Sequence, residues 1–322
     1  MLLNNYNLEP AVKKAGSFFA KKIGRNWEMI SLLIPTVAQG LLWALMALGV
    51  YVTFRVLDIA DLTVEGSFPL GAATAASMMV AGFGPLAALL GACVAGMLAG
   101  IITGILHTKM KIPALLAGIL TMIALYSVNL RIMGKANLSL LGVDTTFKIA
   151  KSMMDLSMAQ TTLVVGLAVT VLVGCFMYWF FGTQIGAAIR ATGFNQQMIR
   201  AQGVDTDVTI ILGLLISNAL VAVSGALVAQ SNGFSDVGMG TGTIVIGLAS
   251  VIIGEVLFGT RSFKNCLISV VLGSIVYRIV IAVVLAMGMP PNDLKLFTSV
   301  LVAIALSMPL IKSKFGARKA VR

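Results

Sequence analysis

Long apolar runs separated by short polar breaks occupy most of this 322-residue chain. If about 20 apolar residues cross a bilayer, spans are predicted at roughly 29–54, 66–82, 84–106, 112–130, 160–182, 206–230, 239–259, 263–288 and 296–311. The pattern predicts an all-α polytopic membrane protein of about 8–10 transmembrane helices. It divides the chain into a lead-in at 1–28, one transmembrane domain at 29–311 and a tail at 312–322.

Basic residues gather in five places: the amphipathic lead-in, 107–111, 190–200, 261–264 and the tail. Because cytoplasmic loops carry an excess of Lys and Arg, all five are expected inside, with both termini cytoplasmic in a bacterial inner membrane. Five apolar runs precede Arg190, so one of them should not cross. The best candidate is 66–82, which is short and rich in Gly, Ala and Ser, and which we expect to be a broken or re-entrant helix.

This topology places the loops near 131–159 and 289–295 outside. Acidic residues are expected to outnumber basic ones on that outer face, where they could help a soluble partner to dock. Solvated loop side chains are the alternative interpretation. The acids concerned are Asp58, Asp61, Glu65, Asp144, Asp155, Asp236 and Asp293.

The second half of the chain weakly repeats the first. The run 206–230 leads into the polar, Gly-rich stretch 231–243 and then into a Gly-containing helix, much as 40–54 leads into 55–71. Paired, interrupted apolar segments are typical of transporter halves, because unwound backbone can line a path for polar solutes. Ordinary loops between packed helices are the alternative.

Composition supports a lipid environment and argues against several functions. With 58% apolar residues, 11% charged residues and a mean hydropathy of +0.99, the chain cannot be a water-soluble globule. The net charge of +11 reflects topology and not nucleic-acid binding, since the basic residues lie at the ends and between apolar runs. One histidine, His107, and three cysteines without paired spacing argue against a metal site or a serine hydrolase triad. No convergent set of nucleophile, base or metal ligands can be assembled, and no G-x-x-x-x-G-K-S/T phosphate loop that would bind ATP is present. We therefore expect no enzyme activity and no cofactor in this chain.

Two ionisable residues fall inside predicted spans, where an unpaired charge costs at least a few kcal/mol. Glu255 and Arg278 could pair with each other as a structural brace, or could line a path and meet the ammonium and carboxylate groups of an amino acid. Glu65, Ser67, Asn218 and Gln230 are further path candidates. Hydrogen bonding between helices is the alternative role for such polar side chains.

A polar stretch at 183–204, which we call the coupling segment, lies between two long spans. Ile185, Ala188 and Ile189 fall on one helical face, Gly193 can end that helix, and Asn195 can cap a second. Two short helices at the membrane surface are therefore predicted. They could form a rigid element that fits a groove on a soluble partner, with Arg190 and Arg200 at its rim, or an interfacial hairpin.

Two motifs resemble a known transporter family. Gly186-Ala-Ala-Ile-Arg-Ala-Thr-Gly-Phe-Asn195, followed by Gln-Gly-Val at 202–204, resembles the coupling segment of permeases in the ABC importer family for branched-chain amino acids and ribose. The stretch 57–72 resembles the region after the first long span in the same family. An Asp-Leu-Thr-Val-acid-Gly-Ser-Phe run and Arg-Ile-Met-Gly at 131–134 are most similar to the subgroup of tryptophan or tyrosine import permeases.

The resemblance implies a type II-like ABC importer that moves a small polar solute, an amino acid and more specifically an aromatic one, by alternating access. Its expected partners are a second copy of this permease, two cytoplasmic ATP-binding subunits that hold ATP and Mg, and an extracytoplasmic solute-binding protein. An ion-coupled secondary transporter, with Glu255 at its coupling site, is the alternative. The residues assigned to ATPase coupling are Gly186, Ile189, Arg190, Ala191, Gly193, Asn195, Arg200 and Gly203.

Overall fold

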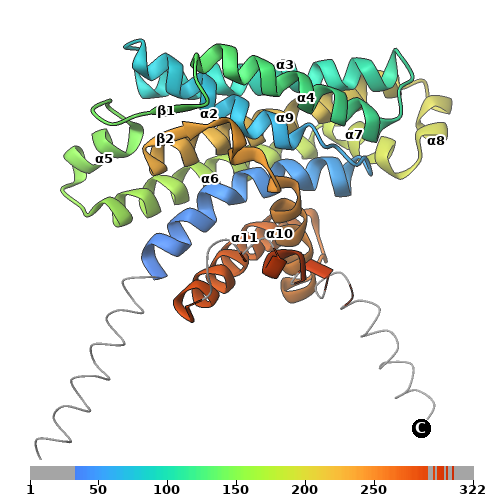
Figure 1. The fold of residues 1–322 in the computed structure, drawn as a ribbon. Coiled ribbons are helices and arrows are strands. Elements are labelled where there is room, and N and C mark those ends of the chain that lie inside the picture. The colour runs from blue at the N-terminus through green and yellow to red at the C-terminus, as the bar shows by residue number, and fades with distance from the viewer. Residues whose placement is uncertain (1–32, 289–292, 294–295, 301, 304–306, 308–322) are drawn as a thin grey trace, which may run out of the picture.

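The structure is a computed structural model that describes residues 33–288, 293, 296–300, 302–303 and 307 (Figure 1). The predicted lead-in and tail lie outside these residues, so their cytoplasmic location stays a prediction. Seven helices in the described part are long and apolar enough to cross a membrane. They are Leu33–Val56, Pro85–Thr108, Ala114–Met133, Met158–Gly182, Thr206–Asn232, Val237–Phe258 and Phe263–Ala286. The predicted all-α membrane fold is confirmed.

The helix Leu33–Val56 ends in a short π-helical turn, η1 (Val52–Val56). The elements that follow, in chain order, are α2 (Val64–Val80), α3 (Pro85–Thr108), α4 (Ala114–Met133), β1 (Asn137–Ser139), α5 (Thr146–Met154), α6 (Met158–Gly182), α7 (Gln184–Phe194), α8 (Gln196–Ala201), α9 (Thr206–Asn232), β2 (Phe234–Asp236), η2 (Val237–Gly240), α10 (Thr243–Phe258) and α11 (Phe263–Ala286).

The long helices lie side by side, with α7 and α8 at one end of the bundle and α5, β1 and β2 at the other (Figure 1). Helix α9 forms the centre, because most of its residues are buried and it packs against both α2 and α3. Small residues permit this packing. A Cβ atom at Gly71 of α2 would overlap the backbone of Ala222, and one at Gly225 of α9 would overlap the backbone of Phe68.

The prediction that 66–82 is broken or re-entrant is wrong. Helix α2 is continuous over Val64–Val80, and the interruption precedes it at 57–63. Leu57 contacts α7 and α9 at one end of the bundle, whereas α2 finishes beside the turn that starts α3 at the other end. The short helix therefore runs through the bundle, and its small, buried residues reflect close packing between α3, α4 and α9.

This correction changes the predicted topology. The helix Leu33–Val56 starts at the end opposite to α7 and α8 and finishes beside them (Figure 1). Asp58 and Asp61 consequently lie in the 57–63 loop, which starts beside α7 and reaches Asn218 in the middle of α9. They do not lie with Asp144, Asp155 and Asp236 at the end that holds α5 and the two strands. The predicted outer acidic face thus loses two of its members, because counting crossings from the sequence gave 66–82 the wrong role.

The two halves of the described chain share one order of elements. In each half a long helix is followed by a break, then by a short helix of 17 residues (α2) or 16 residues (α10), and then by a helix of 24 residues (α3 or α11). The second break contains Gly242, whose φ of 83° favours glycine. Strands β1 and β2 join the halves as an antiparallel pair, with Leu138 opposite Ser235.

Candidate functional site

The coupling segment folds into two short helices that share one capping residue. Thr183 caps α7 by accepting a hydrogen bond from the Gly186 N–H, at 3.3 Å. Asn195 ends α7 and caps α8, since its Oδ1 accepts from the Met198 N–H at 3.0 Å. Helix α7 continues through Gly193, so the prediction that Gly193 ends it is wrong, while the predicted cap at Asn195 is confirmed. A side-chain cap at each start fixes where both helices begin.

One face of α7 packs against three other elements. Gly186 lies against the backbone of α6 at Phe180, and Gly193 lies against the backbone at Val56 and Leu57. Thr192 shares a 2.8 Å hydrogen bond with Thr209 of α9. Ile189 is fully buried on this face, whereas Ile185, predicted to lie on it, is 54% exposed. Helix α7 is therefore held as a rigid body against α6, the end of the first helix and the start of α9.

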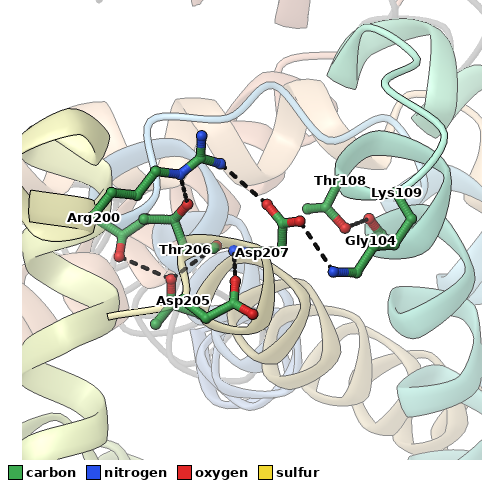
Figure 2. A network of polar contacts seen from close by, with 9 residues as sticks. Gly104, Thr108, Lys109, Arg200, Asp205, Thr206 and Asp207 are labelled. Carbon is green, nitrogen blue, oxygen red and sulfur yellow. Dashed lines mark hydrogen bonds and ion pairs between the residues drawn. The ribbon is translucent and has the colours of Figure 1, made fainter. Parts of the chain in front are cut away.

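A polar network holds α8 in place (Figure 2). Asp207, in the first turn of α9, accepts from Arg200 at 3.2 Å and from Lys109 at 3.1 Å, so it joins the ends of α8 and α3. Asp205 caps α9 by accepting from the Asp207 N–H at 2.8 Å. Exposed ion pairs of this kind contribute about 0–1 kcal/mol each, but together these contacts orient α8. Arg200, predicted to face a partner, is engaged within the chain.

The remaining coupling residues differ in exposure. Ala191 and Gly193 are half-buried, whereas Arg190, Asn195 and Gly203 are exposed. The guanidinium carbon of Arg190 lies 5.4 Å from the centre of the Phe263 ring, which turns this side chain toward α11.

The most exposed large apolar residue of the coupling segment was not singled out from the sequence. Phe194, the last residue of α7, is 90% exposed. A large aromatic side chain held in water by two capped helices is a typical anchor for a protein partner. The signal was the one aromatic residue of the coupling segment, which stands between Gly193 and Asn195.

A buried polar relay joins α9, α2 and the 57–63 loop. Asn218 donates from Nδ2 to Asp61 Oδ2 at 2.9 Å and accepts at Oδ1 from the Ser67 hydroxyl at 2.6 Å. The Thr63 N–H donates to Asp61 Oδ1 at 2.9 Å. Ser67 and Asn218, predicted as path candidates, are thus held in a contact between helices.

The other path candidates lie apart from this relay. Gln230 is buried and accepts through Oε1 from the Thr146 N–H at 2.9 Å, which ties α9 to α5. Glu65 accepts from the Gly242 N–H at 3.0 Å and lines a cavity of about 440 Å³ between α2, α4 and η2.

The predicted Glu255–Arg278 pair does not form. Glu255 instead binds Arg55, with distances of 2.9 and 3.0 Å from Nε to the two carboxylate oxygens. Helices α10 and α11 are consecutive along the chain. Glu255 lies three residues before the end of α10, whereas Arg278 lies 15 residues after the start of α11. At 1.5 Å per residue the two side chains therefore differ in depth by roughly 18 Å. The sequence does not reveal this separation until the helix ends are known.

Arg278 has an aromatic neighbour instead of an acid. Its guanidinium carbon lies 4.0 Å from the centre of the Trp43 ring. Its Nε is buried and has no hydrogen-bond partner within the described part of the chain. The side chain lines a cavity of about 380 Å³ together with Thr241, Gly242 and Tyr277. Within the same residues, no group of three or more His, Cys, Asp or Glu side chains could hold a metal ion.

Comparisons with known proteins agree with this arrangement. Residues 32–316 match a family described as the branched-chain amino acid transport system permease component. The tyrosine transport system permease protein of Clostridioides difficile (strain R20291) is 40% identical over 275 residues, which are 85% of this chain and 90% of that protein. An uncharacterized protein of Rickettsia prowazekii (strain Madrid E) is 34% identical over 86% of this chain and 98% of its own length.

One solved structure has a similar fold. It is a metal-chelate type ABC transporter in an inward-facing conformation, with a TM-score of 0.50 and 15% sequence identity. The similarity covers 87% of this chain and 85% of that one. At this identity the match shows the fold alone.

Proposed function

The chain belongs to the branched-chain amino acid transport system permease family of ABC transporters, in the subgroup of tyrosine transport permeases, and on that premise we propose that it is the membrane-spanning subunit of an ATP-driven importer. The complete importer contains two copies of this permease, two cytoplasmic ATP-binding subunits that hold ATP and Mg, and an extracytoplasmic solute-binding protein. The solute is an amino acid, and the name of the Clostridioides relative favours an aromatic one.

The observation that carries this proposal is that the coupling segment packs firmly against the long helices while Phe194, at the end of α7, is exposed. Helix α7 touches the end of the first helix, the end of α6 and the start of α9, so a displacement of α7 is passed to three long helices at once. Such rigid-body coupling suits a permease whose access alternates when its ATP-binding partners close. A flexible surface hairpin could not transmit the movement.

The orientation follows from the charges at the two ends of the bundle. Basic side chains gather at the end that holds α7 and α8, which we assign to the cytoplasm of a bacterial cell. Among the described residues they are Arg55, Lys109, Lys111, Arg190, Arg200, Arg261 and Lys264, against Arg131, Lys135, Lys148 and Lys151 at the opposite end. The opposite end, with α5 and the β1–β2 pair, then faces the solute-binding protein.

The path for the solute is proposed to pass the second break in the chain. Thr241 borders both the cavity that contains Glu65 and the cavity that contains Arg278. An α-amino acid carries one ammonium and one carboxylate group, which an acidic and a basic side chain can bind in turn. Unwound backbone flanked by such side chains is where transporters bind polar solutes.

The proposal predicts ATP-driven uptake that depends on Arg278. The chain, reconstituted in vesicles with the subunits that co-purify with it from its own cells, should accumulate labelled tyrosine only when ATP is supplied. Arg278→Gln should lower uptake about tenfold or more, as expected for the loss of a charged hydrogen bond. Arg278→Lys should retain more uptake because it keeps the charge.

Leu172→Ala, on an exposed face in the middle of α6 and outside both cavities, is the control and should leave uptake unchanged. Full uptake by Arg278→Gln would remove Arg278 from the path and leave the importer assignment intact. Uptake driven by an ion gradient without any ATP-binding subunit would instead establish a secondary transporter. The structure does not favour that alternative, because Glu255, the proposed ion-coupling residue, is already paired with Arg55.

A further inference from the structure

A cavity of about 660 Å³ opens beside the coupling segment. Three elements form it: the last turn of α6, the outward face of α7 and the first turn of α11. Its lining contains two cationic residues, Arg190 and Lys264, and no acidic residue. The cavity is therefore a basic pocket between helices.

Neither cation is neutralised by the part of the chain that the structure describes. The ion pairs found there join Arg55 to Glu255, and Lys109 and Arg200 to Asp207. Arg190 is held over the Phe263 ring, which positions the guanidinium group and leaves its charge available. The amino-terminal end of α11 adds a partial positive charge to the same pocket. The ligand that suits this pocket is an anion.

The pocket lies at the level of the membrane–water interface. Tyr178 and Trp179, at the end of the long apolar helix α6, line it and are 55% and 65% exposed. Exposed Tyr and Trp side chains at the end of a span are typical of the headgroup layer, because one part of each ring is apolar and the other polar. An anion that reaches the pocket from the bilayer is a phospholipid headgroup.

We propose that this pocket binds the headgroup phosphate of an anionic phospholipid, with Arg190 and Lys264 as its ligands and Tyr178 and Trp179 beside the upper acyl chains. Basic pockets between transmembrane helices on the cytoplasmic side bind anionic lipids in this way. A bound lipid would bridge α7 and α11 at the base of the coupling segment. The proposal needs only the membrane placement of the chain and not its energy source.

Lipid binding can be measured on the full-length chain in nanodiscs that contain either phosphatidylglycerol or phosphatidylcholine. After release into detergent, native mass spectrometry should show phosphatidylglycerol retained in preference to phosphatidylcholine. Lys264→Gln should weaken phosphatidylglycerol retention about fivefold, as expected for one basic residue at an anionic lipid surface. Arg190→Gln should have a similar effect.

Arg261→Gln is the matched control, since Arg261 is an exposed cation in the same connection but does not line the cavity. Equal retention by Lys264→Gln and wild type, with thermal unfolding unchanged, would overturn the proposal. Displacement of the lipid by millimolar inorganic phosphate would assign the pocket to a free anion instead. Displacement by an ATP-binding subunit would assign it to an acidic segment of that partner.

Discussion

Replacing Gly193 by valine should abolish ATP-driven uptake by the importer. A Cβ atom at this position would overlap the carbonyl oxygen of Val56 and the Cα of Leu57, and both are backbone atoms that cannot rotate away. Helix α7 must therefore move off the end of the first helix, at a cost of roughly 1–3 kcal/mol for overpacking. Uptake in vesicles and co-purification of the ATP-binding subunit should both fall, because the displaced coupling segment no longer fits its partner.

Gly174→Ala provides the matched control. Gly174 lies in the middle of α6, and a Cβ atom there would meet nothing within 4 Å. This variant should keep normal uptake and normal association with the ATP-binding subunit. If Gly193→Val also kept normal uptake and normal association, the close contact of α7 with the first helix would not be needed for transport. The mechanical role assigned to that contact would then be wrong.

Replacing Asn218 by leucine should lower the stability of the folded chain by several kcal/mol. The change removes the donor to Asp61 Oδ2 and the acceptor of the Ser67 hydroxyl, both buried. Each of these two buried polar groups costs about 1–3 kcal/mol when it is left without a partner, so roughly 2–6 kcal/mol is expected in total. Denaturant unfolding of the purified chain in detergent measures this loss.

Thr162→Val is the comparison for that measurement. The Thr162 hydroxyl donates only to the Met158 carbonyl of its own helix, at 2.8 Å, so its removal should leave stability nearly unchanged. A loss of stability in Asn218→Leu no larger than in Thr162→Val would show that the relay between α9, α2 and the 57–63 loop is not a structural contact.

The features predicted correctly from the sequence depend on neighbouring residues. The apolar runs predicted the helices because a span needs only length and composition, and seven such helices are present in the described residues. Asn195 as a helix cap was predictable because its partner, the Met198 N–H, lies three residues away. Phe194 could have been found from its neighbours too, as the one aromatic residue of the coupling segment, between Gly193 and Asn195.

The features predicted wrongly depend on contacts between distant residues. Glu255 binds Arg55, 200 positions earlier, and no local pattern selects that partner over Arg278. The role of α2 was misjudged because counting crossings assumed that Arg55 lies outside, whereas Val56 packs beside α7. Loops with few charges are assigned to a side of the membrane by counting the crossings between them and the basic loops. If one short helix is wrongly left out of that count, the loops before it are assigned to the wrong side.

The central claim is that the tip of α7 lies in the cytoplasm and is held by an ATP-binding subunit. Its most direct test is a Phe194→Cys chain in which Cys93, Cys175 and Cys266 are replaced by alanine. In intact cells a membrane-impermeant maleimide should leave residue 194 unlabelled, and in inside-out vesicles residue 194 should cross-link to the ATP-binding subunit. Labelling from outside intact cells, or no cross-link to any such subunit, would contradict the account.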